Sequence, residues 1–191
     1  RHRTYIVKIY WATLSKERLK GFHRLCPVGL PFISASQLVS SGEMREALRD
    51  LKVHDMSYLR KKDDFRIVER AFQIYAHLAN AYVWCEEDNP ENHIPKGVAI
   101  PLVELAEIVE RPPILPYATT SLANFERIDP MGDLVVDNLK CIQKIVDIPD
   151  ESWFHLIHVE IEARAGVANY RCLKATDAIT RNDEKQVEAE L

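Results

Sequence analysis

Residues 65–84 read FRIVERAFQIYAHLANAYVW, and apolar side chains recur in this stretch every three or four positions. The repeating positions are Ile67, Val68, Ala71, Ile74, Tyr75, Leu78, Ala81 and Tyr82. Residues three and four apart share one face of an α-helix, so this spacing is typical of an amphipathic helix. We therefore predict a long helix near 67–84 with one apolar face.

Helical patterns continue on both sides of this stretch. We predict a short helix at 42–50 and further helices near 98–110, 117–125, 136–146 and 151–166, with another over 170–191. Pro101 and Pro116 support two of the starts, because proline is tolerated in the first turn of a helix. The one convincing alternating pattern of a strand is YIVKIYW, at residues 5–11. The predicted fold class is all-α.

The composition is that of an ordinary globular protein, with 47% apolar residues, 28% charged residues and a formal net charge of −4. A nucleic-acid-binding surface is not indicated, because it would require a basic stripe. The sequence has no apolar run of about 18 residues, so it predicts no membrane span. Its four cysteines are scattered and form no C-x-x-C pair, which is typical of reduced thiols in a cytoplasmic protein.

We interpret both ends of the chain as cuts or processing sites. The chain starts at Arg1 without a methionine, and it stops in the strong helix-forming sequence NDEKQVEAEL. We expect it to be part of a longer protein. Near the start, Pro27, Gly29 and Pro31 interrupt regular structure, so residues 1–30 are predicted to be an irregular segment.

Two histidines interrupt the apolar segment WFHLIHVEIEA at residues 153–163. With Glu162, His155 and His158 form an H-x-x-H-x-x-x-E string, and such ligands at one-turn spacing suit zinc or non-haem iron. No second His/Glu cluster is visible in the chain to complete a coordination shell. A buried histidine that is hydrogen-bonded to a neighbour is therefore the more ordinary explanation.

The stretch YATTSLANF at residues 117–125 contains a second candidate site. On a helix, Tyr117, Thr120 and Ser121 would share one face. An aromatic ring and two hydroxyls of this kind are suited to lining a small-molecule pocket. They are equally compatible with core packing in which the hydroxyls bond to the preceding turn. Spacing alone leaves both interpretations open.

Five segments, taken in order, carry a resemblance to a known family. They are AHLANAYVW (76–84), VAIPLVEL (98–105), RPPILPYA (111–118), LANF followed by DP (122–130), and WFHLIHVEIEARAG (153–166). Together they resemble the indoleamine 2,3-dioxygenase family over roughly residues 30–190. Several motifs in the same order are more specific than any one of them.

The resemblance implies a haem b enzyme made of two α-helical domains. Residues 1–147 would form a small N-terminal domain, and residues 148–191 would be the first helices of a larger haem-binding domain. Members insert both atoms of O₂ across the indole C2–C3 bond of tryptophan, which gives N-formylkynurenine in the kynurenine pathway. The expected partners are therefore tryptophan or a related indole and molecular oxygen, and the expected state is a monomer.

The resemblance also assigns roles to single residues. Tyr117, Thr120 and Ser121 match positions that line the distal side of the haem pocket. Phe154 matches an aromatic residue that packs on the indole. His158 matches the polar distal position, where an imidazole can hydrogen-bond to O₂ or to the indole N–H. His155 falls at an aromatic position, and we interpret it as structural.

Two functional residues of the family have no counterpart in the chain. The histidine that ligates the iron and the arginine that pairs with the substrate carboxylate lie downstream in relatives. Residues 1–191 are thus expected to hold no metal ligand, to form one wall of an active site, and to be inactive alone. The alternative is a non-catalytic descendant that binds haem or O₂ or acts as a structural partner.

Overall fold

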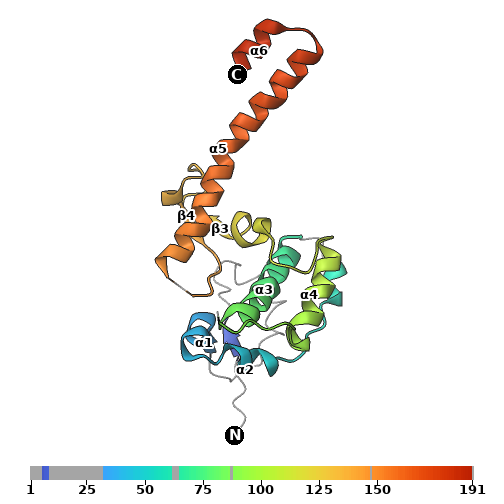
Figure 1. The fold of residues 1–191 in the computed structure, drawn as a ribbon, viewed down its shortest axis with the longest axis vertical. Coiled ribbons are helices and arrows are strands. Elements are labelled where there is room, and N and C mark those ends of the chain that lie inside the picture. Colours follow the sequence, from blue (N-terminus) through green and yellow to red (C-terminus); the bar gives the residue numbers. More distant parts are fainter. Residues whose placement is uncertain (1–5, 9–31, 62–64, 87, 147, 191) are drawn as a thin grey trace.

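Helix α3 (Phe65–Trp84) lies at the centre of the fold, and its side chains from Ala71 to Ala79 are all buried. Helix α4 (Lys96–Ile108) packs along it. Figure 1 shows this arrangement in a computed structural model, which describes residues 6–8, 32–61, 65–86, 88–146 and 148–190. The helices predicted at 67–84 and 98–110 are confirmed, and so is the all-α class.

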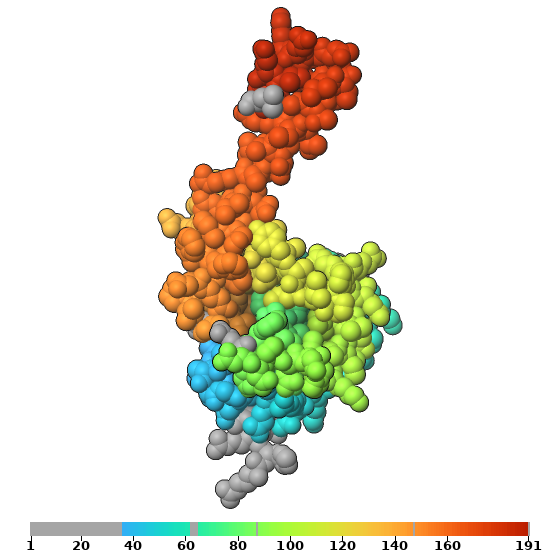
Figure 2. Space-filling model, in the orientation of Figure 1, coloured from blue at the N-terminus to red at the C-terminus, as the bar shows by residue number. Residues whose placement is uncertain are grey.

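Helix α5 (Pro149–Thr180) begins against this body and extends away from it, and α6 (Glu184–Glu190) folds back on its far end (Figures 1 and 2). The predicted end near Gly166 is wrong, as is the separate helix over 170–191, because α5 continues through Gly166 to Thr180. A glycine inside a helix costs only about 1 kcal/mol, and alanines at 163, 165 and 168 favour continuation. The chain reverses at Asn182, whose φ is 55°.

Three short helices close the core around α3 and α4: α1 (Ala35–Ser41), α2 (Met44–Arg49) and the 3₁₀ helix η3 (Ser57–Lys61). Helix α2 confirms the prediction at 42–50. The chain before η3 passes so close to α4 that a Cβ atom at Gly97 would lie 2.0 Å from the carbonyl oxygen of Leu51. The core that results includes Leu38, Met44, Leu48, Phe72, Tyr82 and Leu105.

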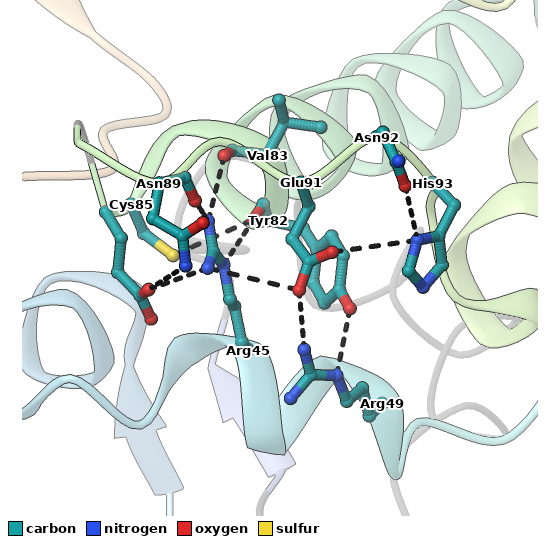
Figure 3. A network of polar contacts seen from close by, with 10 residues as sticks. Arg45, Arg49, Tyr82, Val83, Cys85, Asn89, Glu91, Asn92 and His93 are labelled. Atoms are coloured by element: carbon teal, nitrogen blue, oxygen red, sulfur yellow. Dashed lines mark hydrogen bonds and ion pairs between the residues drawn. The ribbon is translucent and has the colours of Figure 1, made fainter.

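Arg45 on α2 joins the end of α3 to the loop that follows it (Figure 3). Its side chain is buried, and it donates hydrogen bonds to the carbonyl oxygens of Tyr82 and Val83, each at 3.2 Å, and of Asn89 at 2.5 Å. It also pairs with the Glu86 carboxylate at 2.7 Å. The last carbonyls of a helix have no partner within the helix, so Arg45 acts as a cap supplied by another element.

The helix predicted at 136–146 is wrong. This segment forms a 3₁₀ turn, η5 (Val136–Asn138), and then strand β4 (Leu139–Cys141), which pairs antiparallel with β3 (Phe125–Arg127). The pair continues past the strands, because the N–H of Ile142 donates to the carbonyl of Asn124 at 3.1 Å. Cross-strand pairing satisfies the backbone here, and it overrides the helical spacing of the apolar residues.

At the other end of the chain, β1 (Ile6–Lys8) pairs in parallel with β2 (Phe32–Ser34). A strand within YIVKIYW is therefore confirmed, while the rest of the irregular segment predicted at 1–30 lies outside the described residues. Each of the four strands found among the described residues is only three residues long. In the ranges that the structure describes, no helix has both the length and the apolar character of a membrane span.

Candidate functional site

The candidate site begins with a single wide helical turn after Pro116. Instead of the regular helix predicted at 117–125, the chain forms the π-helix η4 (Ala118–Leu122), and strand β3 already starts at Phe125. The wide turn closes where the N–H of Ala123 donates to the carbonyl of Ala118, five residues earlier, at 2.8 Å. Single turns of this kind are rare, and they are frequent at functional sites.

The π-turn changes which side chains point inward. Thr119 and Ser121 are fully buried, Thr120 is half-buried, and Tyr117 is 42% exposed. A regular helix would have placed Tyr117, Thr120 and Ser121 on one face. Thr119 is thus a site neighbour that the helical spacing missed, because the i→i+5 hydrogen bond of a π-turn encloses one more residue than the i→i+4 bond of an α-helix.

The second element of the site is the first part of α5. Pro149 lies in its first turn, where its missing N–H is not needed, and Asp150 and Glu151 follow there. The Glu151 carboxylate also accepts hydrogen bonds from the N–H groups of Ile145 at 2.6 Å and Val146 at 3.0 Å. These contacts tie the helix start to the preceding loop and place the histidines of the next two turns beside η4.

Tyr117, Phe154 and His158 come together across these two elements. The Tyr117 and His158 rings meet edge to face, with centroids 5.5 Å apart, and the Phe154 and His158 rings lie 4.7 Å apart. The Tyr117 hydroxyl donates to the Glu162 carboxylate at 3.2 Å. Desolvation raises the pKa of the Tyr117 phenol, and the contact with Glu162 raises it further. Phe154 remains 54% exposed, so the cluster forms an open aromatic wall.

The hydrogen bonding of His158 fixes the chemistry that its imidazole offers. Its Nδ1 lies 2.5 Å from the carbonyl oxygen of Phe154, one turn earlier. A carbonyl only accepts hydrogen bonds, so Nδ1 carries the hydrogen. In the neutral imidazole the other nitrogen, Nε2, is then an acceptor. His158 is thereby prepared to accept a hydrogen bond from an N–H group of a ligand.

His155 and Ser121 make a second, buried contact between α5 and η4. The Ser121 Oγ lies 3.2 Å from the Nδ1 of His155, and both side chains are buried. Burial lowers the pKa of His155, against the opposing effect of the Glu151 carboxylate. The structure therefore gives His155 the buried, hydrogen-bonded environment that the structural interpretation of this histidine describes.

Beneath the turn lies a layer of polar side chains from α3. Gln73 donates to the carbonyl of Thr119 at 2.8 Å, and the Glu69 carboxylate pairs with Arg111 at 2.7 Å. His77 is also buried here, with its Nδ1 2.8 Å from the Gln73 carbonyl. No sequence signal distinguished Gln73 or His77, because both lie among apolar residues of α3.

The same side chains bear on whether the chain can hold a metal ion or haem. Within the described ranges, no group of three or more His, Cys, Asp or Glu residues is placed to hold a metal ion. The exposed rings of Tyr117 and Phe154, beside a histidine with a free acceptor nitrogen, fit one side of a flat apolar group that carries a small polar ligand. Tyr117 and Phe154 thus leave an exposed aromatic surface next to the His158 imidazole.

The sequence of the chain is similar to those of known proteins of one family. The family model for indoleamine 2,3-dioxygenase matches residues 10–191. Indoleamine 2,3-dioxygenase 1 of Mus musculus is 28% identical over 155 residues, which cover 81% of this chain and 37% of the mouse protein. Indoleamine 2,3-dioxygenase of Saccharomyces cerevisiae is 30% identical over 154 residues, covering 78% and 34%. A relative in Aspergillus nanangensis is 33% identical over 124 residues, covering 62% and 30%.

The matched part of the chain thus spans about a third of the length of these curated relatives. Within that span the match runs through η4 and α5, the two elements that carry the aromatic wall. Because the family model covers nearly the whole chain, the chain belongs to the indoleamine 2,3-dioxygenase family.

Proposed function

We propose that the full-length protein is a haem-dependent dioxygenase that opens the indole ring of tryptophan, and that this chain supplies the distal wall of its active site. The observation that carries the proposal is the meeting of Tyr117, Phe154 and His158 from two different elements. Membership of the family supports the reaction type. The product would be N-formylkynurenine, in which both atoms of O₂ are inserted across the indole C2–C3 bond.

Haem b, bound by the full-length protein, would supply the iron that reacts with O₂. The residues of this chain have three other tasks. Phe154 presents an exposed ring on which an indole can stack, and aromatic pairs of this kind contribute about 0.5–1.5 kcal/mol beyond area burial. Tyr117, the residue just before η4, borders the same space. Together these rings exclude water from one side of the indole.

His158 orients the substrate. Since its Nδ1 hydrogen is engaged by the Phe154 carbonyl, the neutral imidazole has an acceptor at Nε2 and no second donor. The indole ring has one N–H donor, at N1, next to the bond that is cleaved. A hydrogen bond from the indole N–H to Nε2 would fix the C2–C3 bond relative to the aromatic wall. In the neutral state, His158 therefore serves the indole and not O₂.

The experiment compares tryptophan with its N1-methyl analogue, in full-length wild type and His158→Ala. The analogue has no N–H to donate, so wild type should prefer tryptophan in kcat/KM, and the variant should lose roughly 3- to 10-fold of that preference. An unchanged ratio would remove His158 from substrate orientation. Absence of N-formylkynurenine in the reduced, haem-loaded wild type would overturn the dioxygenase proposal and favour a haem- or O₂-binding protein.

A matched substitution separates orientation from packing. In His158→Gln the amide oxygen provides an acceptor near the position of Nε2, so this variant should retain part of the preference for tryptophan. His93→Ala is the control, because His93 is exposed and its Nδ1 contacts only its loop neighbours Asn92 and Glu91 among the contacts that the structure shows. Its kinetics should match those of wild type.

A further inference from the structure

The contact between Ser121 and His155 is a buried link between η4 and α5. It is buried, with Ser121 at 0% and His155 at 8% exposure, and it lies on the inner side of the aromatic wall. The other side-chain hydrogen bond between these segments, from Tyr117 to Glu162, is exposed. An exposed contact competes with water, so the buried one contributes more to holding the two elements in place.

The opposite edge of the π-turn is held by α3. Gln73 donates to the Thr119 carbonyl at 2.8 Å, and the Thr119 hydroxyl lies 3.4 Å from both the Glu69 carboxylate and the Arg111 guanidinium. The Thr119 edge of η4 is therefore held by hydrogen bonds to Gln73, Glu69 and Arg111. The Ser121 edge is the one that connects the turn to α5, which carries Phe154 and His158.

Tyr117 directly precedes the π-turn, and its ring is 42% exposed. Its 5.5 Å ring contact with His158 and its hydrogen bond to Glu162 both reach α5. The orientation of the ring thus depends on where the backbone of η4 sits relative to α5. A change in the Ser121–His155 contact would move Tyr117 without altering any atom of the wall.

We propose that Ser121 and His155 are positioning residues, and that their hydrogen bond sets the register between η4 and α5 and hence the place of Tyr117 beside His158. In this role neither side chain needs to touch the substrate. The expected effect of this hydrogen bond on tryptophan binding rests on the proposed function. The effect on the position of Tyr117 does not. The family resemblance implies that Ser121 lines the pocket directly. In this proposal Ser121 instead acts through the position of Tyr117.

The direct test is fluorine NMR of the full-length protein labelled with 3-fluorotyrosine, with the Tyr117 resonance assigned by its loss in Tyr117→Phe. The Tyr117 resonance should shift in Ser121→Ala and in His155→Leu. The double variant should add little to either, because one contact is lost in all three. Thr176→Ala is the control, since this exposed hydroxyl on α5 bonds only to the Cys172 carbonyl of its own helix among the contacts shown.

Two polar substitutions of His155 test whether the position of its hydrogen-bonding atom matters. Asparagine places its amide where histidine has Nδ1, so His155→Asn should restore the wild-type resonance. Glutamine carries its amide one carbon further, so His155→Gln should not. If the resonance stays unmoved in both Ser121→Ala and His155→Leu, or if Gln restores it as well as Asn, the positioning proposal is overturned.

Kinetics add the link to the proposed function. Ser121→Ala and His155→Leu should raise KM for tryptophan roughly 2- to 10-fold, as the loss of one buried hydrogen bond allows, with His155→Asn close to wild type. In a Tyr117→Ala background the same substitutions should have no further effect on KM. A shifted resonance in a protein that makes no N-formylkynurenine would sink the proposed function and leave the positioning role standing.

Discussion

Asn124 and Gln143 hold the β3–β4 pair together by two reciprocal hydrogen bonds. The Asn124 amide donates to the Gln143 carbonyl at 2.9 Å, and the N–H of Gln143 donates to the Asn124 side-chain oxygen at 2.9 Å. Both residues are buried. The Asn124 side chain thus satisfies both backbone groups of Gln143 beyond the last paired strand residue.

Asn124→Ala should lower the free energy of unfolding by about 2–4 kcal/mol, because it leaves the buried Gln143 N–H without its acceptor and the Gln143 carbonyl with only the weakly donating Cys141 thiol. Urea denaturation of the two proteins measures this difference. Asn169→Ala, at an exposed position of α5, should change stability by less than about 0.5 kcal/mol. Equal effects of the two substitutions would show that the buried pair has no special weight.

Two glycines should respond in opposite directions to alanine. Gly97→Ala should be strongly destabilising, because its Cβ would lie 2.0 Å from the Leu51 carbonyl oxygen and force α4 away from the core. Gly166→Ala should stabilise by about 0.5–1 kcal/mol, because the position is helical and nothing lies within 4 Å of the new Cβ. Thermal denaturation of each variant gives the sign directly.

Arg45→Met should cost about 3 kcal/mol or more of stability. It would leave the Tyr82, Val83 and Asn89 carbonyls without this donor and remove a nearly buried charge from its Glu86 partner. Arg60→Met is the matched control. Its ion pair with Glu107 is exposed on both sides and should contribute less than about 1 kcal/mol. Chemical denaturation curves that shift equally for both would contradict the capping role of Arg45.

Acid should destabilise the protein through His77. Burial lowers the pKa of His77 from 6.5 to about 4, and no described residue pairs with its Nε2, which would bear the added proton. The unfolded chain takes up that proton near pH 6.5, so stability is fully present above this pH. It is lost as the pH falls toward about 4, by up to about 3 kcal/mol.

The pH slope of the unfolding free energy in urea, measured between pH 7 and pH 4.5, tests this account. His77→Gln cannot titrate, so its slope should be shallower than that of wild type. Thr176→Ala, which removes no titratable group and lies at an exposed site, should leave the slope unchanged. A wild-type slope in His77→Gln would assign the acid sensitivity to other groups, such as His155, whose pKa is also lowered by burial.

The helices that could be predicted from the sequence are those whose own apolar faces build the core. α3 and α4 follow the expected spacing because one side of each is buried. Residues 136–146 show similar spacing, yet they form a turn and a strand, because β3 and buried Asn124 offer their backbone a better partner. Such a partner lies outside any local pattern, so periodicity alone could not reveal it.

The candidate site divides in the same way. Tyr117, Phe154 and His158 were identified by motif, and the structure brings these three side chains into contact. The inner layer was not identified, because Thr119 turns inward only through the π-turn and Gln73 lies within an apolar run of α3.

Helix α5 connects two distant parts of the molecule by one continuous element. At about 1.5 Å per residue, its 32 residues form a rod of about 48 Å, with Phe154 and His158 near one end and α6 at the other. Leu156 and Val159 hold the near end against the body, and Figure 1 shows the far half projecting beyond it. A force applied to the projecting end of α5 would therefore be transmitted along the helix to Phe154 and His158.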